Sequence, residues 1–404
     1  MKKDPRYVAW IILLTAFLIF CFIVTAVPLG TRYHILHAEA KHEASVEALT
    51  GTVIVEPSVG RGFVPLESGE DMQIPEGSMV RVDETSEAMI TFFDQSFVRL
   101  FPGATVRLER IRSPRYAAGK SSNSIHVGLS GGQIYVGTAL SSDPSLDFRV
   151  ATLHSDVALA ADGSYALEAT NRRSGITVYA RGRAHVSAKN DDTSGVEVMP
   201  RQRTEVAFGQ SPNPPVDAAR NLVVNGDFSE GLEKDWHAFN DQGTDGGNVD
   251  GTFSLVVDEG RRAVEFSRTD GHGNHCETVL EQSIDRTIPE PVSSLVVRAN
   301  VKVRYQSLSG GGYLSSEYPL MIRLTYRDIY DSEAEWVRGF YYQNVEENPT
   351  TFGVRVPHDR WYLFQSENLL ETLPIRPYRI IRLRVYASGW DYESLISDIN
   401  LIVE

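Results

Sequence analysis

The chain has 404 residues, a formal net charge of −14 and two cysteines. A negative balance of this size argues against nucleic-acid binding, because phosphate contacts require a basic face. The length exceeds what one hydrophobic core usually holds and predicts two domains.

Residues 7–30 form an apolar run without charges, directly after Lys2, Lys3 and Arg6. A helix of this length crosses a hydrocarbon core of about 30 Å. The preceding basic residues place residues 1–6 in the cytoplasm and the bulk of the chain outside the cell membrane. The run is longer than the core of a cleavable signal peptide, so we predict an uncleaved single-pass anchor, with cleaved secretion as the alternative.

The rest of the chain divides into four segments. Residues 31–45 read as a continuation of the helix or a stalk, and residues 209–219, with three prolines, as a semi-rigid linker. Residues 46–208 and 220–404 both show short alternating runs broken by Gly, Pro and Asp, which predict two all-β domains. Because Cys21 falls in the apolar run and Cys276 in the second domain, no intrachain disulfide is expected outside the membrane.

Residues 46–208 resemble the FecR domain family. The matching features are Gly51-Thr52-Val53, Ile74-Pro75-x-Gly77-Ser78, Asp94-Gln95-Ser96-x-Val98-Arg99-Leu100, Pro102-Gly103-Ala104-Thr105 and Leu129-Ser130-Gly131-Gly132-Gln133-Ile134-Tyr135-Val136. The founding members are membrane regulators that hold a cytoplasmic sigma factor, which requires a sizeable cytoplasmic region. This chain offers six residues there, so we expect an extracytoplasmic spacer and protein-interaction module.

Residues 220–404 resemble the galactose-binding-like jelly roll of many carbohydrate-binding modules. The resemblance rests on the opening Asn221-Leu222-Val223-Val224-Asn225-Gly226-Asp227-Phe228-Ser229 and on the ending Ile396-Ser397-Asp398-Ile399-Asn400-Leu401. It implies a β-sandwich, polysaccharide binding and a structural calcium held near the chain ends by Asp398 and Asp227. Ser229 stands where the family often has Glu.

Sugar binding on such a fold requires exposed aromatic side chains that stack on pyranose rings. The candidate ligand-binding residues, of which Trp390 and Tyr392 are expected to be the most exposed, are Trp336, Tyr341, Tyr342, Tyr386, Trp390 and Tyr392. Trp236 and Trp361 are expected in the core. The loop 309–318 would form one wall of a cleft or serve only as a long connection.

No nucleophile with a neighbouring base stands in a recognisable context, so we expect a protein that is not an enzyme. The sequence thus predicts a membrane-anchored, extracytoplasmic binding or scaffold protein with an all-β architecture and a carbohydrate-binding jelly roll. Two alternatives remain open. The jelly roll would contact an envelope protein in assembly, or the chain would act as a FecR-type sensor through protein partners.

Overall fold

The computed structural model describes residues 5–57, 60, 62–117, 119–140, 145–189, 191–218, 220–244, 247–288 and 292–403. Residues 1–4, most of the expected cytoplasmic segment, lie outside the described residues. Apart from one long N-terminal helix and one short helix, the described elements are β-strands, which confirms the all-β prediction.

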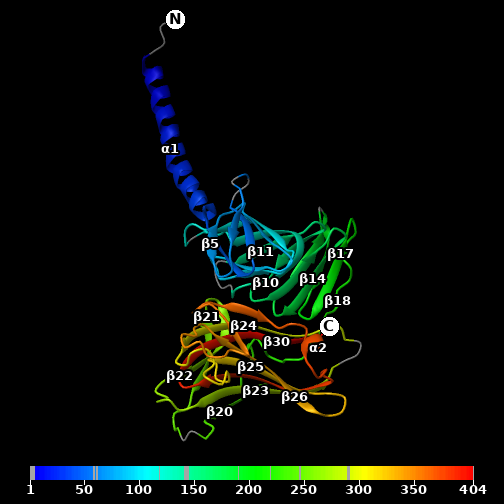
Figure 1. The fold of residues 1–404 in the computed structure, drawn as a ribbon. Coiled ribbons are helices and arrows are strands. Elements are labelled where there is room, and N and C mark those ends of the chain that lie inside the picture. Colours follow the sequence, from blue (N-terminus) through cyan, green and yellow to red (C-terminus); the bar gives the residue numbers. More distant parts are fainter. Residues whose placement is uncertain are drawn as a thin grey trace.

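The helix α1 (Pro5–His37) extends away from the β-strands (Figure 1). An 18-residue window within Leu13–His37 has a mean hydropathy of 2.4 and buries none of its residues in the rest of the molecule. This length and apolarity suit a membrane span, and they suit a signal sequence equally.

The helix continues past Gly30 and is joined to the first sheet without a stalk. The Lys120 amide donates to the Leu36 carbonyl oxygen (2.9 Å), and the Arg115 amide donates to the Ala38 carbonyl oxygen (2.9 Å). Residues 39–41 then form the first strand, where the Glu39 carboxylate receives two hydrogen bonds from Arg110 (2.6 and 2.7 Å). The end of α1 is therefore fixed to the β structure by backbone hydrogen bonds.

In the described part of the chain, the N-terminal β block comprises the eighteen strands that follow α1 and closes into a barrel. Its strands are β1 (Glu39–Lys41), β2 (Ala44–Thr50), β3 (Val53–Glu56), β4 (Val64–Leu66), β5 (Asp71–Ile74), β6 (Met79–Val82), β7 (Glu87–Thr91), β8 (Phe97–Leu100), β9 (Thr105–Pro114), β10 (Asn123–Gly137), β11 (Leu146–Ala151), β12 (Ser155–Leu159), β13 (Ser164–Ala169), β14 (Arg173–Ala180), β15 (Ala184–Ala188), β16 (Asp191–Val198), β17 (Gln202–Ala207) and β18 (Val216–Asp217).

The long strand β10 pairs with two different sets of strands along its length. Its first half pairs with β9 and β11, and its second half pairs with β8 and β13. The change of partners occurs near Gly132, which has φ +85°, and a Cβ added there would lie 2.4 Å from the Ala104 Cα. Only glycine tolerates that approach.

The segment 209–219, expected to be a linker, lies along β17. The Asn213 carbonyl oxygen accepts a hydrogen bond from the Thr204 hydroxyl (2.6 Å), and β18 pairs with β17. The segment thus ends as part of the N-terminal block.

The C-terminal β block contains the remaining strands and one short helix, α2 (Leu369–Thr372). Its strands are β19 (Arg220–Asn221), β20 (His237–Asp241), β21 (Thr252–Asp258), β22 (Arg261–Arg268), β23 (Cys276–Thr287), β24 (Leu295–Gln306), β25 (Leu320–Arg327), β26 (Glu333–Tyr341), β27 (Gly353–Arg355), β28 (Tyr362–Gln365), β29 (Arg379–Gly389) and β30 (Tyr392–Val403).

Two sheets of this block enclose one core. We call the sheet β21-β22-β30-β24-β28, with β19 beside β30, the inner sheet, and the sheet β20-β23-β29-β25-β26-β27 the outer sheet. Alternate residues of β24, such as Val297, Ala299 and Val301, are fully buried between them. This alternation of buried and outward residues is typical of a β-sandwich.

The inner sheet faces the N-terminal block (Figure 1). The outward residues of β24 are polar, yet Arg298 is only 5 % exposed. Its guanidinium lies 4.7 Å from the ring centroid of Tyr135 and 4.6 Å from that of Tyr179, both in the N-terminal block. Leu363 of β28 packs in the same cluster as Phe97 and Tyr135. The two blocks therefore share a desolvated interface.

Candidate functional site

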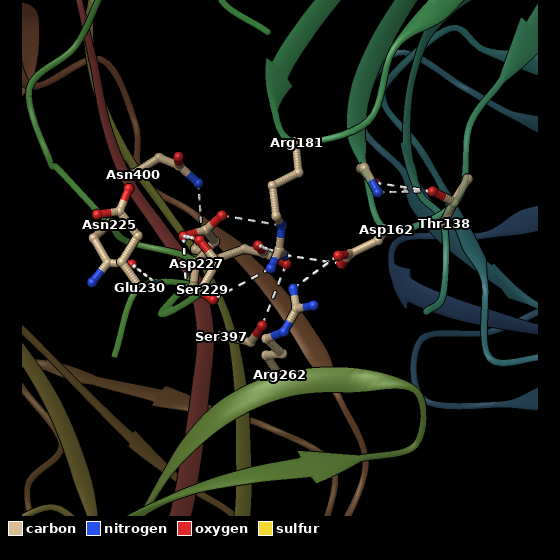
Figure 2. Close-up of polar contacts among 12 residues, drawn as sticks. Thr138, Asp162, Arg181, Asn225, Asp227, Ser229, Glu230, Arg262, Ser397 and Asn400 are labelled. Carbon is tan, nitrogen blue, oxygen red and sulfur yellow. Dashed lines mark hydrogen bonds and ion pairs between the residues drawn. The ribbon is translucent and has the colours of Figure 1, made fainter. Parts of the chain in front are cut away.

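Asp227 and Asp398, the two residues expected to bind calcium, lie together at this interface, and both contact Arg181. Figure 2 shows Arg181 between Asp227 and Asp162. The Arg181 Nη2 atom is 2.8 Å from Asp398 Oδ1, and its Nε atom is 3.1 Å from Asp227 Oδ2. Arg181 comes from the turn between β14 and β15, so the cation comes from the other block.

The local sequence explains how the two aspartates meet. The amide and hydroxyl of Ser229 both donate to Asp227 Oδ1 (3.2 and 3.0 Å), which closes a tight turn. Gly226 lies directly against β30, where an added Cβ would stand 1.9 Å from the Ile399 carbonyl oxygen. The opening and closing motifs of the C-terminal block are therefore adjacent in space.

The ion pairs extend beyond this contact. Asp162 of the N-terminal block binds Arg262 of β22 at 2.8 Å, and its other oxygen lies 3.5 Å from Arg181. Burial alone would lower the pKa of Arg181, but the three neighbouring carboxylates outweigh it and raise that pKa, so the guanidinium stays charged. Asp398 is in turn hydrogen-bonded by the Asn300 side-chain amide (3.1 Å).

These contacts do not fit a calcium ion at Asp227 and Asp398. Calcium takes about six to eight oxygen ligands, whereas here a guanidinium lies against both carboxylates. Among the described residues, no group of three or more His, Cys, Asp or Glu side chains is arranged to hold a metal. The positive charge beside the acid pair is supplied by Arg181.

Three of the predicted sugar-binding aromatic residues are buried. Tyr386 is 0 % exposed and packs with Tyr318 on the outer sheet. Tyr392 is 1 % exposed and its hydroxyl lies 2.6 Å from that of Thr278, and Trp336 is 5 % exposed and stacks on Phe364. The expectation that Tyr392 is exposed is wrong, because the first residue of β30 points into the sandwich. Trp236 and Trp361 are buried, as expected.

Tyr341 and Tyr342 lie on opposite faces of their strand end. Tyr341 packs on the outward face of the outer sheet, with its ring centroid 6.0 Å from that of Tyr318. Tyr342 points to the other side, and its ring centroid lies 4.3 Å from that of His358. Of these two tyrosines, Tyr341 is therefore the one on a face directed away from the core.

Trp390 is the predicted aromatic residue that is truly exposed, at 41 %. A second exposed ring, Tyr313 at 82 %, lies on the same edge of the molecule. Trp390 follows Gly389 and Tyr313 follows Gly312, and both glycines have positive φ. A Cβ atom added at Gly389 would lie 3.2 Å from a methyl carbon of Leu308, and one added at Gly312 would lie 3.8 Å from the same carbon. We call this edge, formed by Leu308, Tyr313, Glu317, His275 and Trp390, the loop rim.

Polar groups stand beside the two rings. His275 Nδ1 lies 2.5 Å from Glu317 Oε1, and the backbone amide of Gly271 donates to Asp391 next to Trp390 (2.8 Å). Tyr318, the residue after Glu317, is fully buried, and added Cβ atoms at Gly311 and Gly339 would lie within 2.3 Å of its ring. This packing fixes the loop 307–319 on the outer sheet.

The outward face of the outer sheet continues from the loop rim. The Arg323 Nη2 atom donates to the Tyr386 hydroxyl (2.8 Å), and Arg384 binds Glu281. Glu277 lies on the same face, and its burial raises its pKa despite the nearby Arg323 and His275. Stacking rings at the rim and hydrogen-bonding groups along the sheet are the elements that carbohydrate recognition requires.

Sequence reasoning named the loop 309–318 as a possible cleft wall without singling out Tyr313 or Glu317, and it missed Arg181. The run Ser309-Gly310-Gly311-Gly312 indicates a long loop, but not that Tyr318 anchors it and leaves Tyr313 outside. Arg181 carries no local signal, because its partners come from two distant segments.

No family model matches the chain, and no curated protein matches it. Among solved structures, a protein assigned as an anti-sigma factor from Parabacteroides distasonis is 18 % identical with a TM-score of 0.27, over 35 % of this chain and 59 % of that chain. A family 11 carbohydrate-binding module of a Clostridium thermocellum cellulase is 11 % identical with a TM-score of 0.27, over 46 % of this chain and 95 % of that chain. A carbohydrate-binding module specific for non-crystalline cellulose is 11 % identical with a TM-score of 0.25, over 44 % of this chain and 93 % of that chain. At these scores the likenesses do not assign the chain to any of these families.

Proposed function

We propose that the chain is a membrane-anchored, extracytoplasmic binding protein without catalytic activity, whose C-terminal block binds a polysaccharide at the loop rim. In this proposal α1 is the single-pass anchor, and the N-terminal block holds the C-terminal block at a fixed position outside the membrane. The observation that carries the proposal is the pair of exposed rings, Trp390 and Tyr313, brought to one edge by Leu308.

The packing of the two blocks supports this choice of surface. The inner sheet contacts the N-terminal block through Arg298, Leu363 and Asp398, so its face is not offered to a large ligand. The outward face of the outer sheet is on the opposite side of the sandwich, and the loop rim lies at an edge, in connections that join the two sheets. A glycan chain stacked on the rim would extend along Tyr341 and Arg323.

The N-terminal sequence supports the orientation. Lys2, Lys3 and Arg6 precede the apolar run, and the positive-inside rule keeps such residues in the cytoplasm. The β blocks would then lie on the far side of the membrane, where a polysaccharide of the envelope or the surroundings is accessible.

A second function, docking of an envelope protein, is favoured by a different observation. Leu314 and Val345 are 78 % and 82 % exposed on two loops that are joined by a hydrogen bond from the Ser309 hydroxyl to the Asn344 side-chain oxygen (3.0 Å). Aliphatic side chains do not stack on sugar rings, and exposed apolar groups of this kind often mark protein contacts. A protein partner would use Leu314 and Val345, whereas a glycan would use Trp390 and Tyr313.

The experiment is affinity electrophoresis of the full chain, in a neutral detergent, through gels that contain mixed-linkage β-glucan, soluble cellulose derivative, galactan or no polysaccharide. We expect retardation by one of these polymers, lost in W390A and Y313A. Y330A is the matched control, because Tyr330 is also 82 % exposed but lies in the β25–β26 hairpin at the other end of the outer sheet.

Two results would reject the glycan function. One is an unchanged mobility in every gel, and the other is an equal loss of retardation in Y330A. The protein-partner function predicts instead that L314S and V345S abolish cross-linking to an envelope protein and that W390A does not.

A further inference from the structure

We infer that a cavity between the two β blocks is a binding site for a small ligand that carries a carboxylate, sulfate or phosphate group. The cavity opens to solvent, with Arg201, Arg220 and Arg286 all exposed, and its volume of about 440 Å³ is within the usual size range of small-molecule sites. Its lining combines Arg201 and Asp217 of the N-terminal block with Arg220, Arg286 and Thr287 of the C-terminal block. This cavity is distinct from the loop rim, and the inference goes beyond the proposed function.

The charge of the lining carries the choice of ligand. Three arginines face a single carboxylate, that of Asp217, in a chain whose net charge is −14. In the part of the chain that the structure describes, no ion pair joins Arg201, Arg220 or Arg286 to a carboxylate. A guanidinium presents parallel N–H groups that match the two oxygens of an oxyanion, so unpaired arginines in a cavity favour such a ligand.

Irregular backbone places two of these arginines in the lining. Arg201 has φ +69°, a left-handed conformation that is unfavourable for a residue with a side chain. Arg286 follows an irregularity in the pairing of β23 with β29, where Asp285 has φ +44°. β-Bulges commonly redirect a side chain. The neighbouring Asp285 carboxylate is 2.7 Å from Arg379, so its charge is already paired.

The site requires that the two blocks be docked. The amide of Ala218 donates to the Arg201 carbonyl oxygen (2.8 Å), which fixes the end of β18 beside Arg201. The next residues of the cavity, Arg220 and Asn221, already belong to the C-terminal block, where β19 pairs with β30. A ligand bound here would contact both blocks and stabilise their docking.

The same chemistry can come from an acidic sugar or from a free oxyanion, and calorimetry of the full chain in neutral detergent separates the two. The probes are D-galacturonate, D-galactose and inorganic phosphate. We expect D-galacturonate to bind and D-galactose, which lacks the carboxylate, to give no heat. Phosphate binding as tight as that of D-galacturonate would identify a free oxyanion as the ligand and would also support the site.

The test variant is the double variant R220Q/R286Q. The control is R203Q, because Arg203 is an exposed arginine on β17, two residues from Arg201, and is not among the lining residues. We expect the double variant to weaken binding by on the order of a hundredfold, since each lost charge-assisted hydrogen bond costs roughly tenfold. Three results would overturn the inference: no heat from either anion with the unaltered protein, unchanged binding in the double variant, or equal binding of D-galactose. W390A must leave D-galacturonate binding intact, which separates this site from the proposed polysaccharide site.

Discussion

Arg181 and Asp398 are 217 positions apart in the sequence, and their side chains meet at 2.8 Å between Nη2 and Oδ1. Arg181 is the cation of the N-terminal block, and Asp398 and Asp227 form the acid pair of the C-terminal block. The interaction is largely buried, and each partner would leave an uncompensated charge if the other were removed. This contact, together with Arg298 between Tyr135 and Tyr179, makes the two blocks one unit.

The first prediction concerns the loss of this cation. R181M leaves the Asp398 and Asp227 charges in a desolvated interface, so we expect a loss of about 3–5 kcal/mol in the free energy of unfolding. Urea denaturation followed by tryptophan fluorescence measures it. The control is R183M, because Arg183 is exposed two residues away. Equal stability of R181M and R183M would contradict a role for Arg181 in docking.

The second prediction concerns calcium. Because Arg181 lies against both carboxylates, we expect millimolar calcium to leave the melting temperature of the unaltered protein unchanged within the error of the measurement. Magnesium is the control for a general effect of divalent cations. A rise in melting temperature with calcium but not magnesium would show that a metal competes with Arg181 for Asp227 and Asp398.

The third prediction concerns pH. Burial raises the pKa of Glu277 in the folded state, so its ionised form costs stability at neutral pH. This cost is fully present above the raised pKa and disappears as the pH falls through it toward the ordinary value of about 4.3. E277Q should therefore be more stable than the unaltered protein at pH 8, and the difference should shrink at pH 5.

Urea denaturation at pH 5, 6, 7 and 8 measures this difference, with E367Q as a control because Glu367 is exposed. A stability difference between E277Q and the unaltered protein that stays constant with pH, or that grows as the pH falls, would show that desolvation does not control Glu277.

The sequence was a good guide where a feature depends on local pattern. The apolar run predicts α1, although the helix extends past Gly30 to His37, where the Ala38 amide still donates to the His34 carbonyl oxygen (2.8 Å). Alternation of apolar and polar residues predicts the strands of both blocks. The need of a β-sandwich for core aromatic residues predicts that Trp236 and Trp361 are buried, and both are.

Features that depend on two distant segments could not be predicted from the sequence. Tyr392 follows Asp391 in a polar stretch that resembles a loop, but a strand begins at this residue and its ring enters the sandwich. Polar residues alternate with apolar ones along β24, and this pattern gives no sign that the polar face contacts the N-terminal block. The sequence pattern shows which face of a strand is polar and does not show what covers it.

The last prediction concerns the glycine that joins the two end motifs of the C-terminal block. A Cβ at Gly226 would stand 1.9 Å from the Ile399 carbonyl oxygen, a backbone atom that cannot move aside without disturbing β30. Ile399 also donates its amide to the Gly226 carbonyl oxygen (2.9 Å), so both residues must shift together. Because Asp227 and Asp398 adjoin these residues, the shift would reach the contact with Arg181.

We therefore expect G226A to lower the free energy of unfolding by about 1–3 kcal/mol, the usual cost of forcing extra volume into a packed site. It should also weaken the additional effect of R181M, because neighbouring changes are not additive. G131A is the control, since Gly131 has open space around its Cα. If G226A and G131A unfold at the same urea concentration, or if G226A and R181M are fully additive, the end motifs do not position the acid pair for Arg181.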